Sequence, residues 1–314
     1  MSAANLPNLQ KNPSEVGFWL RLRQVRFQGQ RIDYIAYFFI APYFLLFLLL
    51  KLVPILFGVY VSFTNWSITK APRWVGLANY QRLLEDEWVV RVWGNTAKLA
   101  LLILPGTIVV ALLFALYANR RWWLSGLVRT FVFAPKTVAI TVTALIWVWI
   151  LEKETGLVNL LLAQLGFAKV GWLTTPIWVL PVLATVTVWW GVGYHMVIVL
   201  AGLQEISSEL LEAARLDGAN DRQLFWKITL PLLRPALILV ITLELIASFR
   251  IFGQVHLMTG GGPGGKSATI VSYIYSTGFS RFQLGYAATL SLLLFVTILL
   301  VSWIRVLFVK ELDV

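Results

Sequence analysis

Six apolar stretches dominate this sequence, and each has at least the roughly 20 residues that a helix needs to cross the hydrocarbon core of a bilayer. They are residues 34–63, 99–118, 127–151, 177–203, 236–257 and 285–308. Helices satisfy their own backbone groups in lipid, so the pattern predicts an all-α polytopic membrane protein with six transmembrane helices. Pro42, Lys51 and Pro54 fall inside the first stretch, which predicts either a kinked long helix or a helix with one end in the interface.

The composition supports the membrane assignment. Hydrophobic residues make up 59% of the chain and charged residues 13%, against about 45–50% and about 25% in an ordinary soluble domain. The net charge of +11 is spread over short segments between the apolar stretches, so no nucleic-acid partner is expected. With no cysteine and two histidines, the chain has no disulfide framework, and neither a metal site nor a cofactor is expected.

The distribution of Lys and Arg predicts the orientation in the membrane. Fourteen lie on the side of the N-terminus and nine on the other, while Lys51, Lys136 and Arg250 lie inside the stretches. Cytoplasmic loops carry the excess of positive charge, so both termini are predicted to be cytoplasmic. No removable signal peptide is recognised, and the first stretch is expected to serve as its own insertion signal.

Three regions follow from this pattern. Residues 1–33 form a basic cytoplasmic leader, in which residues 16–27 suit either an interfacial helix or a solvated tail. Residues 34–308 form the transmembrane domain, and residues 309–314 form a cytoplasmic tail. The longest cytoplasmic segment, residues 204–235, lies between the fourth and fifth stretches.

This segment is predicted to be a compact helical element. Ser207 or Ser208 can cap a first helix, and Gly218 provides a left-handed stop. A second short helix is expected over residues 219–228, ending before Pro231. Small alanines flanked by charged residues would form an exposed ridge suited to the groove of a soluble partner; the alternative is an amphipathic helix in a solvated loop.

The same segment carries a resemblance to a known family. It resembles the EAA loop of the permease subunits of bacterial ABC importers, in the form found in carbohydrate-uptake permeases such as those for maltose, trehalose and glycerol-3-phosphate. The loop residues that match are Glu212, Ala213, Ala214, Arg215, Asp217, Gly218 and Ala219, followed by Phe225, Pro231 and Pro235. Similar family segments are residues 62–66, 74–80, 201–204, 259–263 and 285–288, so only the leader lies outside the resemblance.

The resemblance implies a protein that is not itself an enzyme. It would form half of the pore of a sugar importer in the bacterial plasma (inner) membrane, surrounded by lipid. The implied partners are a second homologous permease, two copies of a cytoplasmic ATP-binding subunit and an external solute-binding protein. The EAA loop would act as a coupling helix that docks into the ATPase. Glycerol-3-phosphate or a polyol is the alternative substrate to a mono-, di- or oligosaccharide.

A second motif matches a nucleotide-binding pattern that does not fit its position in the chain. Residues 260–267 satisfy the Walker A pattern G-x-x-x-x-G-K-[ST]. That motif binds phosphate only between a strand and a helix of a nucleotide-binding domain, which a short external segment between two membrane helices cannot supply. The match is interpreted as false. Gly260, Gly261, Gly262 and Pro263 are instead expected to form a flexible loop, either a hinge or a surface that meets the binding protein.

Ionisable groups at bilayer depth usually face a cavity or a partner. His195 and Glu244 lie at similar depths in the fourth and fifth stretches and could pair. The substrate path is predicted to include Tyr194, His195, Glu244, Arg250 and Gln254, with nearby Trp147, Trp149, Trp189 and Trp190 as aromatic surfaces. The alternative for these polar residues is inter-helix hydrogen bonding or contact with the second permease. Two cations, Arg250 and Lys136, are compatible with a phosphate ester as the substrate, whereas Glu244 argues against such a substrate.

A rival of another class is an ion-coupled secondary transporter that works alone through His195 and Glu244. It would require inverted repeats with broken helices, which the sequence does not show, and it leaves the EAA loop unexplained. An intramembrane enzyme is disfavoured because neither an HExxH nor a GxSxG pattern is present.

Overall fold

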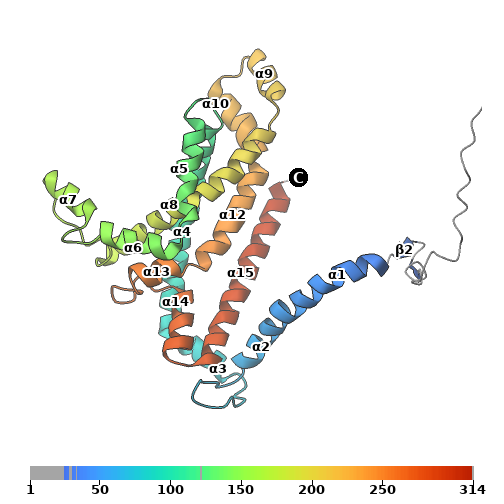
Figure 1. Ribbon diagram of the computed structural model, residues 1–314, viewed down its shortest axis with the longest axis vertical. Helices are drawn as coiled ribbons and strands as arrows, with labels where there is room; N and C mark the ends of the chain where they lie inside the picture. Colours follow the sequence, from blue (N-terminus) through green and yellow to red (C-terminus); the bar gives the residue numbers. More distant parts are fainter. Residues whose placement is uncertain (1–24, 28–29, 33, 121, 313–314) are drawn as a thin grey trace, which may run out of the picture. The chain divides into compact units, whose positions relative to one another are not determined.

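The computed structural model describes residues 25–27, 30–32, 34–120 and 122–312 (Figure 1). The chain divides into two units, residues 1–58 and 59–314. In the described part the one sheet is a small antiparallel pair, β1 (Val25–Phe27) and β2 (Gln30–Ile32). The interfacial helix predicted over residues 16–27 therefore does not include β1, and residues 16–24 lie outside the described residues.

The first apolar stretch is one long helical span. It consists of α1 (Tyr34–Phe47), a π-helical turn η2 (Leu48–Leu52) and α2 (Val53–Ser62). Pro54 cannot donate a backbone N–H, and its ring would crowd the carbonyl four residues earlier. The wider π turn immediately before α2 accommodates it, so the stretch continues as a helix and Lys51 lies within the π turn.

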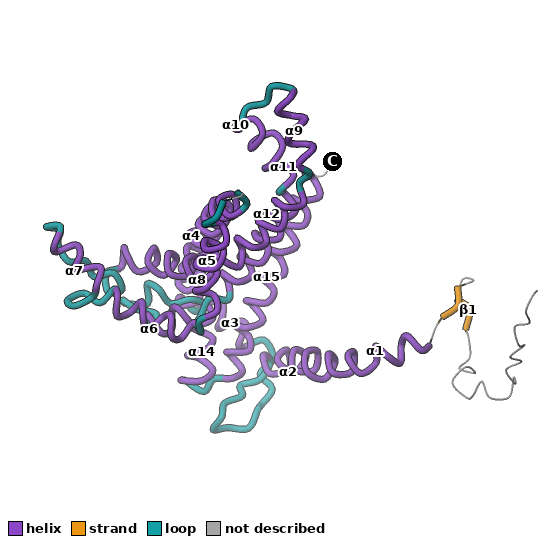
Figure 2. The backbone as a smooth tube through the Cα atoms, turned by 45° about the horizontal axis from the view of Figure 1, so that its top comes forward, coloured by secondary structure: helices purple, strands orange, loops and turns teal. Residues whose placement is uncertain are grey.

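The second unit is built on a bundle of long helices. Its main members are α4 (Glu87–Ala118), α5 (Ser125–Thr137), α8 (Pro176–Glu205), α12 (Arg234–Phe249) and α15 (Leu284–Leu312). Figure 2 shows α4, α5 and α8 clustered together. Small residues allow this close packing: a Cβ on Gly193 of α8 would overlap the backbone of Val132 in α5, and one on Gly202 would crowd Ala236 of α12.

Two of the six predicted spans are bent rather than straight. The third breaks between α5 and α6 (Ile140–Ile150), where the axis turns by 99°. The fifth is preceded by α10 (Asp221–Leu224), η3 (Phe225–Thr229) and α11 (Leu230–Leu232), which meet α12 at 61°. Four described helices are long and apolar enough to cross a membrane, or up to six if each bent pair counts as one span.

The bends correct three sequence predictions. One continuous third span was expected over residues 127–151, but α5 ends at Thr137 and the backbone is extended at Val138. The fifth span was expected to run to residue 257, but α12 ends at Phe249 and a separate helix, α13 (Gly253–Met258), follows. The second short helix predicted over residues 219–228 does not end before Pro231, because helical structure continues through α11.

Short helices complete the two ends of the second unit. Near one end lie α3 (Ala78–Glu85), α14 (Ile270–Tyr275) and the π-helical turn η4 (Ser276–Ser280), and at the other end lies α9 (Ser208–Leu216) (Figure 1). The remaining helix, α7 (Leu157–Gln164), follows α6.

One carboxylate connects three helices at the α3 end. Asp86 caps α4 by accepting the backbone N–H of Trp88 at 3.0 Å, and its other oxygen accepts the hydroxyls of Tyr273 at 2.6 Å and Tyr286 at 2.7 Å. Burial alone would raise the pKa of Asp86. The hydrogen bonds from these three donors and the positive charge of Arg82 outweigh it, so the pKa lies below its ordinary value.

Candidate functional site

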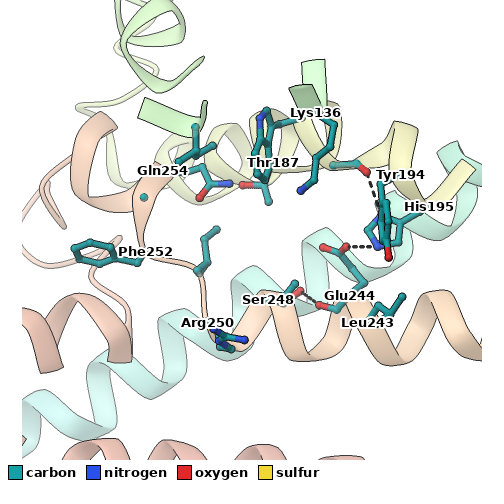
Figure 3. A pocket seen from close by; sticks show the side chains of 16 residues that line it. Lys136, Thr187, Tyr194, His195, Leu243, Glu244, Ser248, Arg250, Phe252 and Gln254 are labelled. Atoms are coloured by element: carbon teal, nitrogen blue, oxygen red, sulfur yellow. Dashed lines mark hydrogen bonds and ion pairs between the residues drawn. The ribbon is translucent and has the colours of Figure 1, made fainter. Parts of the chain in front are cut away.

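A cavity of about 500 Å³ lies where α12 ends, between α5, α8, α12 and α13 (Figure 3). It is the point at which both the bend after α5 and the break after α12 interrupt the bundle. The lining residues are Lys136, Ile140, Thr187, Trp190, Gly191, Tyr194, His195, Leu243, Glu244, Ala247, Ser248, Arg250, Ile251, Phe252, Gly253 and Gln254. All five residues predicted for a substrate path, Tyr194, His195, Glu244, Arg250 and Gln254, are among them.

Local backbone geometry opens this space. The backbone leaves the helix at Arg250, and Phe252 precedes the first turn of α13 with φ −139° and ψ −56°. Gly253 then approaches Ile140 of α6 so closely that an added Cβ would lie 3.3 Å from its side chain. On the opposite wall, Trp190 and Tyr194 are four residues apart on α8 and therefore share a face.

The two acid–base groups predicted to pair are in contact. His195 Nε2 lies 3.1 Å from Glu244 Oε2, and the two residues are 6% and 5% exposed. The other ring nitrogen, Nδ1, lies 3.2 Å from the carbonyl oxygen of Gly191. The pairing of His195 with Glu244 is thus confirmed, and it ties α8 to α12.

Two cations line the same cavity. Lys136 reaches in from the last turn of α5, and its Nζ lies 3.5 Å above the ring of Trp190 (Figure 3). The indole N–H of Trp190 is already used, because it donates to the carbonyl of Val138 at 3.1 Å. Arg250 stands at the end of α12. Within the described chain, neither cation has a carboxylate within the 4.0 Å that defines an ion pair.

The predicted aromatic cluster separates into different environments. Trp190 lines the cavity, but Trp147 packs edge-on against Trp189 at 5.3 Å and lines a smaller apolar cavity of about 250 Å³. Trp149 is 76% exposed. Thr187 was missed although it lies seven residues before Tyr194, the spacing of one helix face. Phe252 was also missed, because nothing in the apolar pattern marks the break at which it stands.

The predicted cytoplasmic element has the expected boundaries at its first helix. Ser207 accepts the backbone N–H of Glu209 at 3.2 Å and caps α9, and Gly218 has φ +88° just beyond its end. None of the nine residues of α9 is buried in this chain, and Leu216 is 89% exposed. The helix stands clear of the bundle (Figure 2). The residues carried over from the EAA resemblance, Glu212, Ala213, Ala214, Arg215, Asp217, Gly218 and Ala219, lie on it and on the turn that follows it.

The glycine loop, residues 259–268, has none of the surroundings of a phosphate-binding loop. It connects α13 to α14, so helices and not a strand precede and follow it. Ser267 is fully buried and donates to the carbonyl of Gly262 at 2.5 Å. Asn95 of α4 donates to the carbonyls of Gly265 at 2.9 Å and Ala268 at 3.0 Å. These contacts hold the loop against α4, in contrast to the flexible loop that its glycines predicted.

The described helices and the cavity at their breaks define a multi-pass membrane component with a polar interior site. Residues 107–314 match the family described as binding-protein-dependent transport system inner membrane component, and the chain belongs to that family. Its recognition as a permease subunit resembling those of carbohydrate-uptake ABC importers is confirmed by relatives and solved structures alike.

Two relatives illustrate the likeness. The sulfoquinovosyl glycerol transport system permease protein SmoG of Agrobacterium fabrum is 30% identical over 287 residues, which cover 90% of this chain and 92% of the relative. The arabinooligosaccharides transport system permease protein AraP of Bacillus subtilis is 33% identical over 274 residues, covering 85% and 86%. A solved bacterial ABC transporter involved in the import of the acidic polysaccharide alginate contains a chain with a TM-score of 0.78 and 25% identity, covering 89% of this chain and 96% of that one.

Proposed function

We propose that this chain forms half of the pore of an ABC importer and conducts a saccharide delivered by an external solute-binding protein. The observation that carries the proposal is the cavity itself: polar groups from α5, α8, α12 and α13 converge on about 500 Å³ inside a largely apolar bundle. The sugars named for SmoG and AraP support a saccharide as the cargo. Glycerol-3-phosphate or a polyol is the alternative cargo for the same architecture.

The proposal includes the way in which ATP hydrolysis reaches the cavity. The exposed helix α9 docks as a coupling helix into one of two copies of a separate cytoplasmic ATP-binding subunit, and a second homologous permease completes the pore. Six spans with both termini in the cytoplasm place α9 on the side of ATP and the glycine loop outside, where it faces the binding protein. The chain itself hydrolyses nothing and needs no cofactor.

A secondary transporter remains the rival that the fold makes worth testing. A secondary transporter of this kind would need broken helices, which the sequence did not predict, and the chain has such breaks at the bends of 99° and 61°. Against it stand the family match and the exposed α9, which a transporter working alone would have no reason to present.

The test uses the tagged full chain in native membranes and in the reconstituted importer. We expect a second permease and an ATPase to co-purify, and Glu212→Lys and Gly218→Pro to insert normally while reducing binding-protein-stimulated ATP hydrolysis to its basal rate. Glu205→Lys, the same charge change at the exposed end of α8, serves as the matched control. Unchanged coupling in both α9 variants, or transport by the chain alone without ATP, would overturn the proposal.

A further inference from the structure

The charge of the cavity follows from the hydrogen bonds of His195. A carbonyl oxygen can only accept, so the contact between Nδ1 and Gly191 is a hydrogen bond in the tautomer that carries its proton on Nδ1, and we assign that tautomer here. The 3.2 Å and 3.1 Å contacts then leave Nε2 facing a carboxylate oxygen, and a second proton must lie between His195 and Glu244. Whether it is bonded to nitrogen or to oxygen, the pair carries no net charge. Glu244 is therefore not a free anion in the cavity.

Lys136 and Arg250 remain as the cations that form no ion pair, although Glu244 attracts Lys136 from beyond ion-pair distance. They come from α5 and α12 and both line the cavity, and no carboxylate in the described part of the chain lies within ion-pair distance of either. Cations at bilayer depth are costly unless something neutralises them, so they are usually functional, and Arg250 is exposed in this chain and open to a ligand. Guanidinium and ammonium groups together are also the standard donors for carboxylates, sulfonates and phosphates.

The neutral polar groups suit the rest of a sugar. Gln254 is only 6% exposed, lines the cavity and makes no hydrogen bond to another described residue, so its amide is available to a ligand there. Trp190 is less suited to stack on a neutral sugar ring, because the amine of Lys136 already covers one face of its indole. An amide beside two cations that form no ion pair matches a hydroxylated ligand that also carries negative charge.

We propose that the saccharide conducted by this permease carries an anionic group, a carboxylate, sulfonate or phosphate, which Lys136 and Arg250 bind while Gln254 bonds a hydroxyl. The proposal rests on the function proposed above and names the substrate class of the same cavity. It also removes the sequence-based objection to an anion, because that objection came from Glu244.

The experiment compares ligands that differ in charge alone. The complete importer in proteoliposomes is tested with digalacturonate and its neutral dimethyl ester, and the anion is varied with sulfoquinovosyl glycerol and glucose-6-phosphate. Uptake and stimulated ATP hydrolysis are measured, together with direct binding to the importer without binding protein at low and high salt. We expect at least one acidic probe to be preferred over the neutral ester by 10-fold or more in kcat/KM, with binding that weakens in high salt.

The variants assign the preference to the two cations. Arg250→Gln and Lys136→Gln should each lower uptake of the preferred acidic probe by about 10-fold or more, the usual effect of losing a charge-assisted hydrogen bond. Arg250→Lys and Lys136→Arg keep the charge and should retain most of the uptake. Lys70→Gln, an exposed cation outside the cavity, is the matched control.

The failure of this inference is distinguishable from failure of the proposed function. Preference for neutral saccharides, or an acid-to-neutral ratio that both Gln variants leave unchanged, overturns the anionic substrate and leaves a sugar importer. If no saccharide in a panel of acidic and neutral probes is transported or stimulates ATP hydrolysis in the complete assembly, the proposed function fails, and the inference fails with it.

Discussion

Replacing Asp86 with alanine should destabilise the end of the bundle where α4 begins. The substitution removes the cap on α4, which contributes about 1 kcal/mol in other helices. It also removes a charged acceptor from the hydroxyls of Tyr273 and Tyr286, and hydrogen bonds to charged groups contribute about 1.5–3 kcal/mol each. Because water can reach part of this site, we take the lower end of each range and expect a loss of about 3–4 kcal/mol.

A graded series tests the reasoning. Asp86→Asn keeps a capping oxygen and should lose less than Asp86→Ala, whereas Tyr273→Phe and Tyr286→Phe each remove one of the two hydroxyl contacts and should lose about 1–2 kcal/mol. Thermal unfolding of the chain in nanodiscs, followed by tryptophan fluorescence, measures the series. At about 2–4 °C per kcal/mol, Asp86→Ala should lower the Tm by roughly 6–16 °C. A Tm within 2 °C of wild type, roughly 0.5–1 kcal/mol on that scale, would show that Asp86 does not connect these helices.

Three further predictions follow from named contacts. The pKa of the Asp86 carboxyl is lower in the folded protein than in the unfolded chain. The stabilisation from ionised Asp86 is therefore fully present above its ordinary pKa and is lost as the pH falls through the lower pKa of the folded protein. Below about pH 4, the Tm of wild type should fall more than the Tm of Asp86→Asn. Gly193→Ala forces a Cβ into the backbone of α5 and should cost about 1–3 kcal/mol by the same unfolding assay, while Gly191→Ala, with nothing within 4 Å, should be tolerated; equal effects would contradict the close approach. Asn95→Ala leaves two carbonyls of the glycine loop without their donor and should speed hydrogen exchange in residues 259–268 by about 10-fold or more, and unchanged exchange would show that other contacts hold the loop.

The sequence predicts contacts well where local periodicity sets them. The pairing of His195 with Glu244 followed from their equal depth in two neighbouring apolar stretches. The boundaries of α9 followed from Ser207 and Gly218, because a cap and a left-handed residue act within a single turn. Such signals depend on neighbouring residues alone, so the tertiary fold does not change the local structure that they predict.

The bends could not be predicted in the same way. Hydropathy measures how apolar a segment is and not the direction of its axis, so residues 127–151 gave one continuous signal across a 99° turn. Pro135 lies inside α5 without breaking it, and the extended backbone begins three residues later, at Val138. Conversely, Pro231 was expected to stop a helix, but it follows the π-helical turn η3, whose wider turn accommodates a proline as η2 accommodates Pro54.

The order of elements along the chain links the proposed coupling helix to the cavity. Helix α8 carries His195 and ends at Glu205, immediately before α9. Helix α12, which carries Glu244 and ends at Phe249, follows α9 after a short series of helical turns. Near the ends that adjoin α9 the two helices are in close contact, because a Cβ on Gly202 would lie 2.8 Å from the side chain of Ala236. A force applied to α9 therefore acts on two helices that are held together twice, at Gly202 and at the His195–Glu244 pair. Because α12 stops just beyond that pair, the displacement would be delivered at the break that forms the cavity, where Arg250 and Gln254 stand on separate segments.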